Sequence, residues 1–203
     1  MYLRPAFAST DTARITALIR DNPFGLLVTT GANGVEASHI PFTLLADGEG
    51  FLLAGHLAAG NAQCAALAGG QALAVFSGPH AYIAPGWYRT QPAVPTWDYC
   101  AVHVSGKLRL TEDEGDILAS LRALAAGDPA GFDLDALAPD YRGKMIAGIR
   151  AFTLKPDKIE AQWKMSQNRS AEDRLGVVAA LRASGDATAD AVAALITQTL
   201  PVA

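Results

Sequence analysis

The chain has 203 residues, of which 50% are hydrophobic and 18% are charged, and its net charge at pH 7 is −4. Such a composition can bury a core, which excludes a disordered chain, and the acidic balance excludes a general attraction for DNA phosphates or anionic membranes. No apolar run reaches the roughly 20 residues that span a bilayer, and the start lacks the basic-then-apolar order of a signal peptide. Because there are only two cysteines and no C-x-x-C spacing, we expect a protein of the reducing cytoplasm.

The first third of the chain predicts a helix followed by an antiparallel meander. Ser9 or Thr10 can cap the helix, residues 15–19 carry its apolar stripe, and Asn22-Pro23 ends it. β-prone runs separated by glycine-containing turns follow: strands over residues 24–30, 35–46 and 51–56, and turns over 31–34 and 47–50.

The middle of the chain predicts two strands around a long irregular segment. We expect a short helix over residues 58–67 and a strand over 72–76. Residues 77–98 are rich in Pro, Gly and aromatic residues, and a segment of this length without regular structure is usually functional or packed against a partner. The clearest strand is 99–110, where apolar and polar residues alternate.

The last part of the chain predicts further helices and two closing strands. Thr111 and Ser170 each open a capping box ahead of a helix, and Gly185 turns the chain into the last helix. Another helical piece is expected over 140–146, and strands over 149–154 and 158–163. The whole pattern predicts an α+β, mainly β fold. We expect a single domain over residues 1–203. We expect it to be an antiparallel barrel of about six or seven strands, with flanking helices and a helical appendage from about residue 170.

Four segments of unusual composition carry a resemblance to a known family: SHIPF at 38–42, GHLAAGN at 55–61, GPHAYI at 78–83 with VPTWDY at 94–99, and KMSQNR at 164–169. Their order and spacing resemble the PaiB-type family, called FMN-binding negative transcriptional regulators, over nearly the whole chain. That family is similar in fold to the split-barrel flavoproteins typified by pyridoxamine 5′-phosphate oxidase. The resemblance implies a six-stranded antiparallel split β-barrel, a homodimer, and FMN bound between the two subunits.

Gly60 and Asn61, at the start of the short helix, are the predicted phosphate site. Glycine lets a phosphate approach the backbone, and the free N–H groups of a helix start favour an anion. Similar split-barrel oxidases have an Arg-Lys pair in this region, which this chain replaces by Ala59, Gly60 and Asn61. The counter-charge must therefore come from elsewhere, and Lys164 or Arg169 are the candidates. The alternative is an ordinary helix start.

Polar residues on three strands are predicted to reach the flavin ring. Ser38 and His39 face opposite sides of their strand, so one of them is expected in the cleft. Gly55 and His56 close the third strand beside the phosphate loop. His103 lies on the polar face of the 99–110 strand, toward the flavin of the other subunit or toward water. Each histidine has a core or surface role as its alternative, and their spacing predicts no metal site.

Aromatic residues around the long strand are predicted to serve the flavin or the dimer. Thr96 and Trp97 precede that strand, where the indole can cover a flavin face or fill the dimer interface. Tyr82, Trp87 and Tyr88 carry the same two alternatives, and interface packing is the favoured one. A segment so apolar is unsuited to water, which predicts an obligate or near-obligate dimer.

The segment 164–169 is predicted to be a cofactor clamp between a strand and a helix. Lys164 and Arg169 can balance phosphate charge, and Gln167 and Asn168 can pair with ring or ribityl oxygens. A plain connection does not need four long hydrogen-bonding side chains in six residues. A solvated loop is the alternative.

Three functions stay open: a regulatory flavoprotein, a flavin-dependent oxidoreductase that uses NAD(P)H and a small acceptor, and a heme-binding or heme-degrading split barrel. The sequence assigns no catalytic residue. Two helices over 170–183 and 188–200 superficially resemble a helix-turn-helix. From Ala183 onward, however, there is no Lys or Arg, while Asp186 and Asp190 are acidic. We therefore expect no specific DNA binding by the chain alone.

Overall fold

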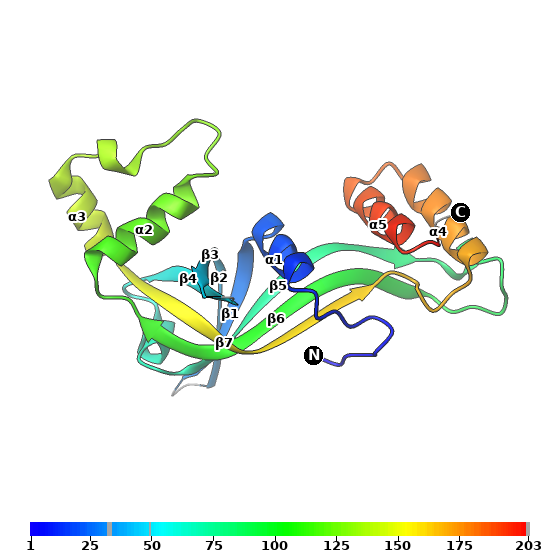
Figure 1. Cartoon of the computed structure of the whole chain (residues 1–203), viewed down its shortest axis with the longest axis horizontal. Coiled ribbons are helices and arrows are strands. Elements are labelled where there is room, and N and C mark those ends of the chain that lie inside the picture. The colour runs from blue at the N-terminus through cyan, green and yellow to red at the C-terminus, as the bar shows by residue number, and fades with distance from the viewer. Residues whose placement is uncertain (32–33, 49, 202–203) are drawn as a thin grey trace. The chain divides into compact units, whose positions relative to one another are not determined.

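The computed structural model describes residues 1–31, 34–48 and 50–201 (Figure 1). Two predicted turns include residues outside this part of the chain, Ala32 and Asn33 in the first and Glu49 in the second. The helices are α1 (Thr12–Asp21), η1 (Ala62–Leu67), η2 (Pro85–Trp87), α2 (Glu114–Ala125), η3 (Leu134–Ala136), α3 (Pro139–Ala147), α4 (Ala171–Ala183) and α5 (Ala187–Gln198). The strands are β1 (Phe24–Gly31), β2 (Gly34–Pro41), β3 (Thr43–Asp47), β4 (Gly50–Ala58), β5 (Gln71–Ile83), β6 (Thr96–Leu110) and β7 (Ile149–Lys164).

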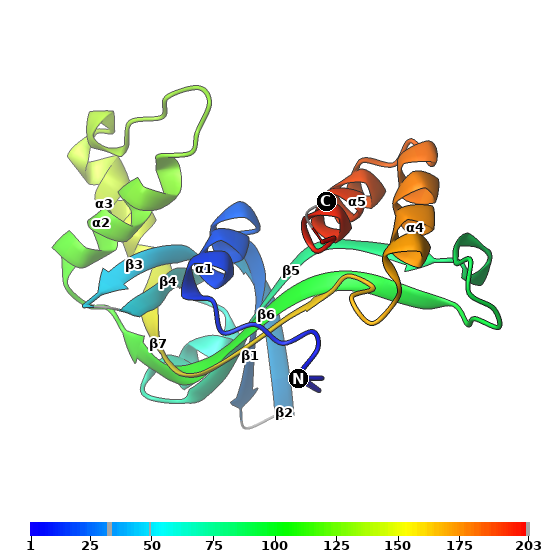
Figure 2. The same cartoon turned by 45° about the vertical axis from the view of Figure 1, so that its right-hand side comes forward.

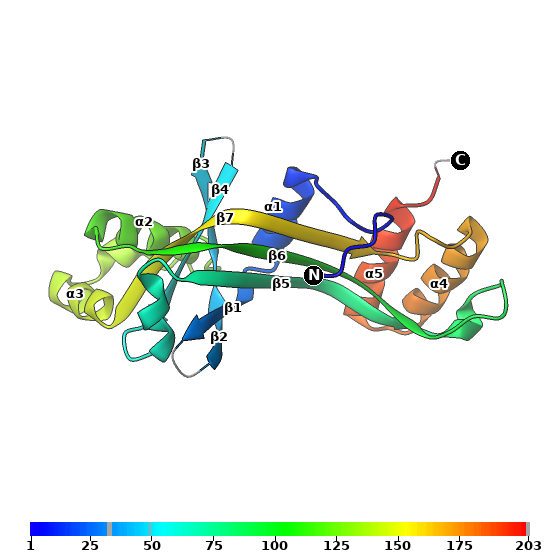
Figure 3. The same ribbon diagram turned by 90° about the horizontal axis from the view of Figure 1, so that it is seen from below.

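The strands form one sheet in the order β2-β1-β5-β6-β7-β4-β3. The pairs β1–β2, β1–β5, β3–β4 and β4–β7 are antiparallel. Figure 3 shows the β1–β2 and β3–β4 pairs on opposite sides of the long strands β5–β7. The prediction of an α+β fold is confirmed. The strand count of six that the resemblance implied is wrong, because the sheet formed by the described residues has seven strands and its two edge strands do not pair with each other.

The strand boundaries show why the count differs. The predicted strand 35–46 is two strands, since the chain bends at Phe42, whose ring is buried and whose N–H donates to Pro23 O at 2.8 Å. The predicted strands 149–154 and 158–163 are instead one strand, β7, because pairing continues through the polar residues between them. Pairing with neighbours outweighs the composition of a single segment in deciding where a strand ends.

The chain divides into two compact units, each built from separated stretches. Unit 1 comprises Met1–Leu18, Ser77–Val102 and Glu160–Ala203. Unit 2 comprises Ile19–Phe76 and His103–Ile159. The long strands β5, β6 and β7 contribute residues to both units.

Unit 2 has an aromatic core around the bend at Phe42. The Phe42 ring meets Phe76 and Phe152 edge to face, at centroid distances of 5.2 and 6.3 Å. On β4, a Cβ added to Gly55 would lie 3.0 Å from Phe152 Cζ and 3.3 Å from Ile40 Cδ1. β2 and β4 are therefore in contact although they lie near opposite ends of the strand order, so the sheet curls round on itself.

Unit 1 contains the helix pair α4–α5, which lie side by side in Figure 2. Val192 and Ile196 of α5 and Leu181 of α4 are buried, while Leu175 of α4 is 54% exposed. The predicted Ser170 cap is confirmed, since its Oγ accepts from Asp173 N at 3.1 Å. Burial of the apolar faces by the pair itself is the reason that these helices form.

The N-terminal segment of unit 1 runs along the edge of β7. Trp163 N donates to Phe7 O at 2.9 Å, and Ser9 N donates to Ala161 O at 3.0 Å. An isolated bridge pairs Ala8 with Gln162. The first residues of the chain are thus fixed beside the end of β7.

Three helix starts differ from the prediction. Asp11 caps α1 by accepting from Arg14 N, and Asp113 caps α2 by accepting from Asp116 N, in place of Ser9 or Thr10 and Thr111. A carboxylate accepts more strongly than a hydroxyl at a helix start. The predicted helix 58–67 is the shorter η1, and the predicted irregular segment begins only after β5 ends at Ile83. In the described chain, the helices are too short or too polar to cross a membrane.

Candidate cofactor site

The predicted cofactor residues fall into two sets, one in each unit. Those in unit 2 are Ser38, His39, Gly55, His56, Gly60, Asn61 and His103. Those in unit 1 are Thr96, Trp97, Lys164, Gln167, Asn168 and Arg169. Within each unit the structure brings some of these side chains together.

Asn61 links the β4–η1 connection to β2. Its Nδ2 donates to Ser38 Oγ at 3.0 Å, and its Oδ1 accepts from Gln63 N at 2.9 Å, which caps η1. Of the two neighbours on β2, Ser38 is thus the one that faces the predicted phosphate loop, while His39 is exposed and stacks on Phe24 at 5.9 Å. Because the side-chain amide of Asn61 is bonded within the protein, the backbone of this loop is the part that can bind a ligand.

Gly60 provides an accessible stretch of backbone. A Cβ added there would meet no heavy atom within 4 Å. In the described part of the chain the Gly60 N–H has no hydrogen-bond acceptor, whereas the N–H groups of Ala59 and Asn61 donate to Gly148 O and Ala58 O. An atom of a ligand can therefore approach this amide closely.

Buried Gln63, on η1, was missed by the sequence reasoning. Its Nε2 donates to Leu27 O, Thr29 Oγ1 and Glu36 O at 2.9 to 3.2 Å. Its Oε1 is buried without a partner among the described residues. Gln63 ties η1 to β1 and β2 and so fixes the loop before it; its place on a short apolar helix gave no signal of this role.

The histidines of unit 2 differ in environment. His56 is half-buried on β4, opposite Ala151 of β7, and burial lowers its pKa. A neutral imidazole can both donate and accept a hydrogen bond, as the edge of a flavin ring requires. His103 is half-buried on β6. The described residues contain no cluster that could hold a metal ion.

Lys164 in unit 1 is held by three acceptors from one end of β6. Its Nζ donates to Thr96 Oγ1 at 2.7 Å and to the backbone oxygen of Trp97. It also pairs with Asp98 Oδ1 at 3.2 Å. An ammonium group has three N–H donors, so Lys164 has none left, and its charge is balanced by the Asp98 carboxylate.

Asp98, at the centre of this network, is fully buried. Its other oxygen, Oδ2, accepts from Ser166 Oγ at 2.7 Å, and Ser166 Oγ lies 3.4 Å from Tyr88 Oη. Burial raises the pKa of Asp98, while the hydrogen bond from Ser166 and the charge of Lys164 act to lower it. Ser166 has φ of +55°, in the left-handed region that a residue with a side chain adopts at a cost.

The rest of the 164–169 segment divides into satisfied and unsatisfied side chains. Gln167 Oε1 accepts from Met165 N at 2.6 Å, and Gln167 Nε2 donates to Trp163 O at 2.5 Å, so this amide is used within its own loop. Arg169 stacks on Tyr88, with Cζ 4.5 Å from the ring centroid. Exposed Asn168 has no hydrogen bond within the described chain, and it lines one pocket with Arg169 and Lys164.

Trp97 is 53% exposed and belongs to an aromatic cluster. Its ring meets Tyr82 edge to face at 6.0 Å and lies 6.1 Å from His80. Tyr82 and Val94 are also exposed, by 47% and 69%. Unit 1 thus presents a surface with an indole that is free to cover a ring or a partner.

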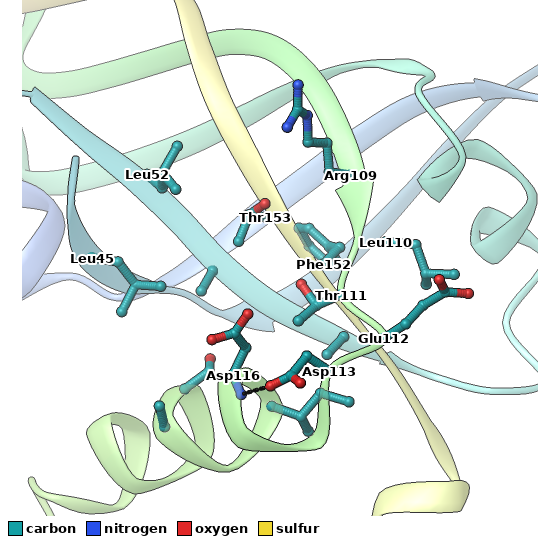
Figure 4. Close-up of a pocket in the computed structure, with 15 residues that line it drawn as sticks. Leu45, Leu52, Arg109, Leu110, Thr111, Glu112, Asp113, Asp116, Phe152 and Thr153 are labelled. Atoms are coloured by element: carbon teal, nitrogen blue, oxygen red, sulfur yellow. Dashed lines mark hydrogen bonds between the residues drawn. The ribbon is translucent and has the colours of Figure 1, made fainter.

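One pocket of unit 2 contains none of the predicted residues (Figure 4). It has a volume of about 450 Å³ between α2 and the strands β3, β4 and β7. Leu45, Leu52 and Phe152 give it apolar lining, and Arg109 and Asp116 are among its charged lining residues. Asp116 is held there because its N–H donates to the Asp113 cap.

The residues of both sets fit the chemistry of a flavin nucleotide in part. Ser38, His56 and the open backbone at Gly60 supply neutral donors and acceptors for the ring edge and the ribityl chain. The unit 2 set has no lysine or arginine, so a dianionic phosphate would need cations from another part of the protein. The described cations of the unit 1 set are Lys164, already balanced by Asp98, and Arg169.

The open, curled antiparallel sheet and these polar sets define an α+β protein of the flavin-binding split-barrel class. The chain belongs to the family described as "Putative FMN-binding domain", whose model matches residues 1–158. Over 202 residues it is 32% identical to protease synthase and sporulation protein PAI 2 of Bacillus subtilis (strain 168), covering 97% of this chain and 96% of that protein. The resemblance to the PaiB-type family is therefore confirmed, as is FMN as the cofactor. The family match ends before the 164–169 segment.

Solved structures share the fold at low sequence identity. The FAD and heme binding protein from Mycobacterium smegmatis has a TM-score of 0.60 and 18% identity, covering 77% of this chain and 73% of that one. The flavocytochrome Anf3 from Azotobacter vinelandii has a TM-score of 0.60 and 16% identity, covering 80% and 72%. At these identities the likeness shows the fold alone.

Proposed function

We propose that the protein is a homodimeric FMN-binding regulator-type flavoprotein in which FMN is bound between two copies of a split barrel. The observation that carries the proposal is the family match over residues 1–158, which brings FMN as the ligand. The open backbone at Gly60 and the half-buried pair Ser38–Asn61 support it, since they offer neutral partners to the cofactor. Exposed Trp97 supports a second copy as part of the site.

The same proposal holds that the chain does not bind DNA by itself. α5 lacks Lys and Arg, and its Val192 and Ile196 are buried in the α4–α5 pair. Asp190 of α5 lies 3.9 Å from Arg182 of α4 and adds negative charge. A helix of this charge is repelled by phosphates, so any effect on transcription would act through another molecule.

Mixed dimers test whether two chains make one FMN site. Gly60→Glu adds a charge in open space, where it opposes the phosphate without disturbing packing, and Trp97→Ala removes the exposed indole. We expect each variant homodimer to lose FMN. If the site joins the two sets across the dimer, a mixed dimer carries one site with both defects and one intact site. It then binds one FMN per dimer.

The contrary result is equally clear. If each chain holds FMN alone, both sites of the mixed dimer are defective and no FMN binds. A wild-type and Gly60→Glu mixture serves as the control for subunit exchange, and light scattering should give twice the 21.2 kDa chain mass. A monomer that binds FMN would contradict the two-chain site.

An absorption spectrum separates the remaining alternatives. A flavin spectrum that bleaches rapidly under anaerobic NADH or NADPH would support an oxidoreductase, whereas an inert flavin spectrum supports the regulatory flavoprotein. A sharp Soret band would support heme binding. We favour the inert flavin, because the predicted set contains no residue placed as a proton donor to a substrate.

A further inference from the structure

A small pocket in unit 1 gathers cationic side chains from separate stretches of chain. It has a volume of about 200 Å³ and lies where the N-terminal segment, the start of β6 and the β7–α4 connection meet. Three of its lining residues are the cations Arg4, Lys164 and Arg169, and Ser166 and Asn168 add polar groups.

Within the described part of the chain, two of the three cations have no counter-charge. Asp98 balances Lys164. Arg4 lies over the Phe7 ring at 5.5 Å, and Arg169 lies over the Tyr88 ring at 4.5 Å. Neither guanidinium has a carboxylate partner among the residues that the structure describes. A guanidinium that lies over a ring rather than beside a carboxylate keeps its full charge for another acceptor, so the pocket has two positive charges to spare.

The wall of the pocket is held by hydrogen bonds within the protein. Ser166 is 2% exposed, has the left-handed φ of +55° and is held by buried Asp98. Arg169 N donates to Ser166 O at 2.9 Å, which closes the turn. On the other side, Phe7 is fixed by Trp163 N, and Phe7 N donates to Arg4 O at 2.9 Å. Strain that the surrounding structure maintains is a mark of a functional position.

We propose that this pocket binds the anionic group, a carboxylate or a phosphate, of a small molecule other than FMN. Its volume suits one such group with a few attached atoms and is below the range of pockets that enclose a drug-sized ligand. The adjoining pocket shares Arg4 and Lys164 with it and is lined by Trp97 and Tyr99, so an aromatic or aliphatic body attached to the anion has a place to lie. The proposal rests on the proposed function in one respect: the FMN phosphate is taken to lie at the open backbone of Gly60 and to draw its counter-charge from outside this pocket.

The test is calorimetric titration with inorganic phosphate and, separately, with benzoate, on FMN-free and FMN-loaded protein. We expect one of the two probes to bind both forms with similar affinity, and the stronger probe identifies the anion class. Arg169→Gln is expected to weaken binding at least tenfold, about 1.4 kcal/mol. Arg4→Gln is expected to weaken it as well. Arg89→Gln is the matched control, because Arg89 is an exposed arginine of the same unit that pairs with Glu172 at 3.3 Å.

Three outcomes overturn the proposal. One is that neither probe binds the folded dimer. Another is that Arg169→Gln and Arg89→Gln bind the probe equally well, with unchanged circular dichroism. The third is that FMN and phosphate compete, because the pocket would then hold the phosphate of FMN. FMN affinity is measured by flavin fluorescence on the wild type and on the same variants. A wild-type protein that does not bind FMN would contradict the proposed function but would leave the anion-pocket proposal standing.

Discussion

The connection after β4 and the connection after β7 both lead from a strand into a helix, and both were expected to hold FMN. In the first, residues 59–61, the side chains are small and neutral, and Gly60 leaves the backbone open. In the second, residues 165–170, Ser166 adopts a strained φ and rests on the buried carboxylate of Asp98. The difference teaches that space and charge are supplied by different units: the first connection offers room for a ligand, and the second offers a cation, Arg169.

Among the substitutions that test this comparison, removal of the Asp98 carboxylate should cause the largest loss in the free energy of unfolding. Asp98→Ala leaves Lys164 without its counter-ion and Ser166 without its acceptor, and breaking a buried pair costs about 3 kcal/mol in the free energy of unfolding. Urea denaturation measures the loss. Asp190→Ala is the control, since Asp190 is exposed and its pair with Arg182 is worth at most about 1 kcal/mol. Equal losses in the two variants would show that the Asp98 network does not stabilise the fold.

Ser166 allows the strain to be separated from the hydrogen bond. Ser166→Ala and Ser166→Gly both lose the bond to Asp98, but only glycine relieves the left-handed φ. We therefore expect the glycine variant to be more stable than the alanine variant by about 1 kcal/mol, measured by thermal or urea unfolding. An alanine variant as stable as the glycine variant would argue against strain at this turn.

Asn61 gives the equivalent comparison in the uncharged connection. Asn61→Ala loses both the cap on η1 and the bond to Ser38, at a cost of about 1 kcal/mol, whereas Asn61→Asp keeps an acceptor for Gln63 N. Urea or thermal unfolding should show that Asn61→Asp is more stable than Asn61→Ala. FMN affinity should fall further for Asn61→Asp, because its added charge would repel a phosphate bound at Gly60. If the aspartate variant instead bound FMN like the parent, the phosphate would lie elsewhere.

The smallest expected effect is a pH dependence from His56. Burial lowers the pKa of His56 in the folded protein, so below its usual value of 6.5 the unfolded chain binds the proton more readily. The free energy of unfolding should therefore be fully retained above pH 6.5 and should fall as the pH drops toward the folded pKa. His56→Gln should remove this part of the slope between pH 7 and 5. A slope unchanged by the substitution would assign it to other groups.

Sequence patterns predicted most of the elements but not all of their limits. The Ser170 cap and the α4–α5 pair follow from local chemistry, and the structure has them. The division of residues 35–46 at Phe42 does not, because it depends on a ring that fits between Phe76 and Phe152, far away in sequence. The merging of two predicted strands into β7 is likewise set by its neighbours.

The candidate site shows the same division between local and distant causes. Composition could identify Lys164 and Gln167 as polar, but not that Thr96 and Asp98 would take up the ammonium group or that Gln167 would bond its own loop. A signal for Asp98 did exist. Side chains alternate between the two faces of β6, so Asp98 shares a face with Cys100 and Val102. Extending this alternation back from the predicted strand places Asp98 on the buried side.

The bend at Phe42 has a consequence for how the molecule opens. β2 and β3 are the two edges of the sheet, yet a single buried residue separates them in the chain. In an ordinary open sheet either edge strand can fray while the other remains paired. Here neither β2 nor β3 can separate from the sheet unless the Phe42 ring leaves the core, and that movement also disturbs the other edge strand. The amides of Ala37 to His39 in β2 and of Leu44 to Ala46 in β3 should therefore exchange with solvent in one cooperative event.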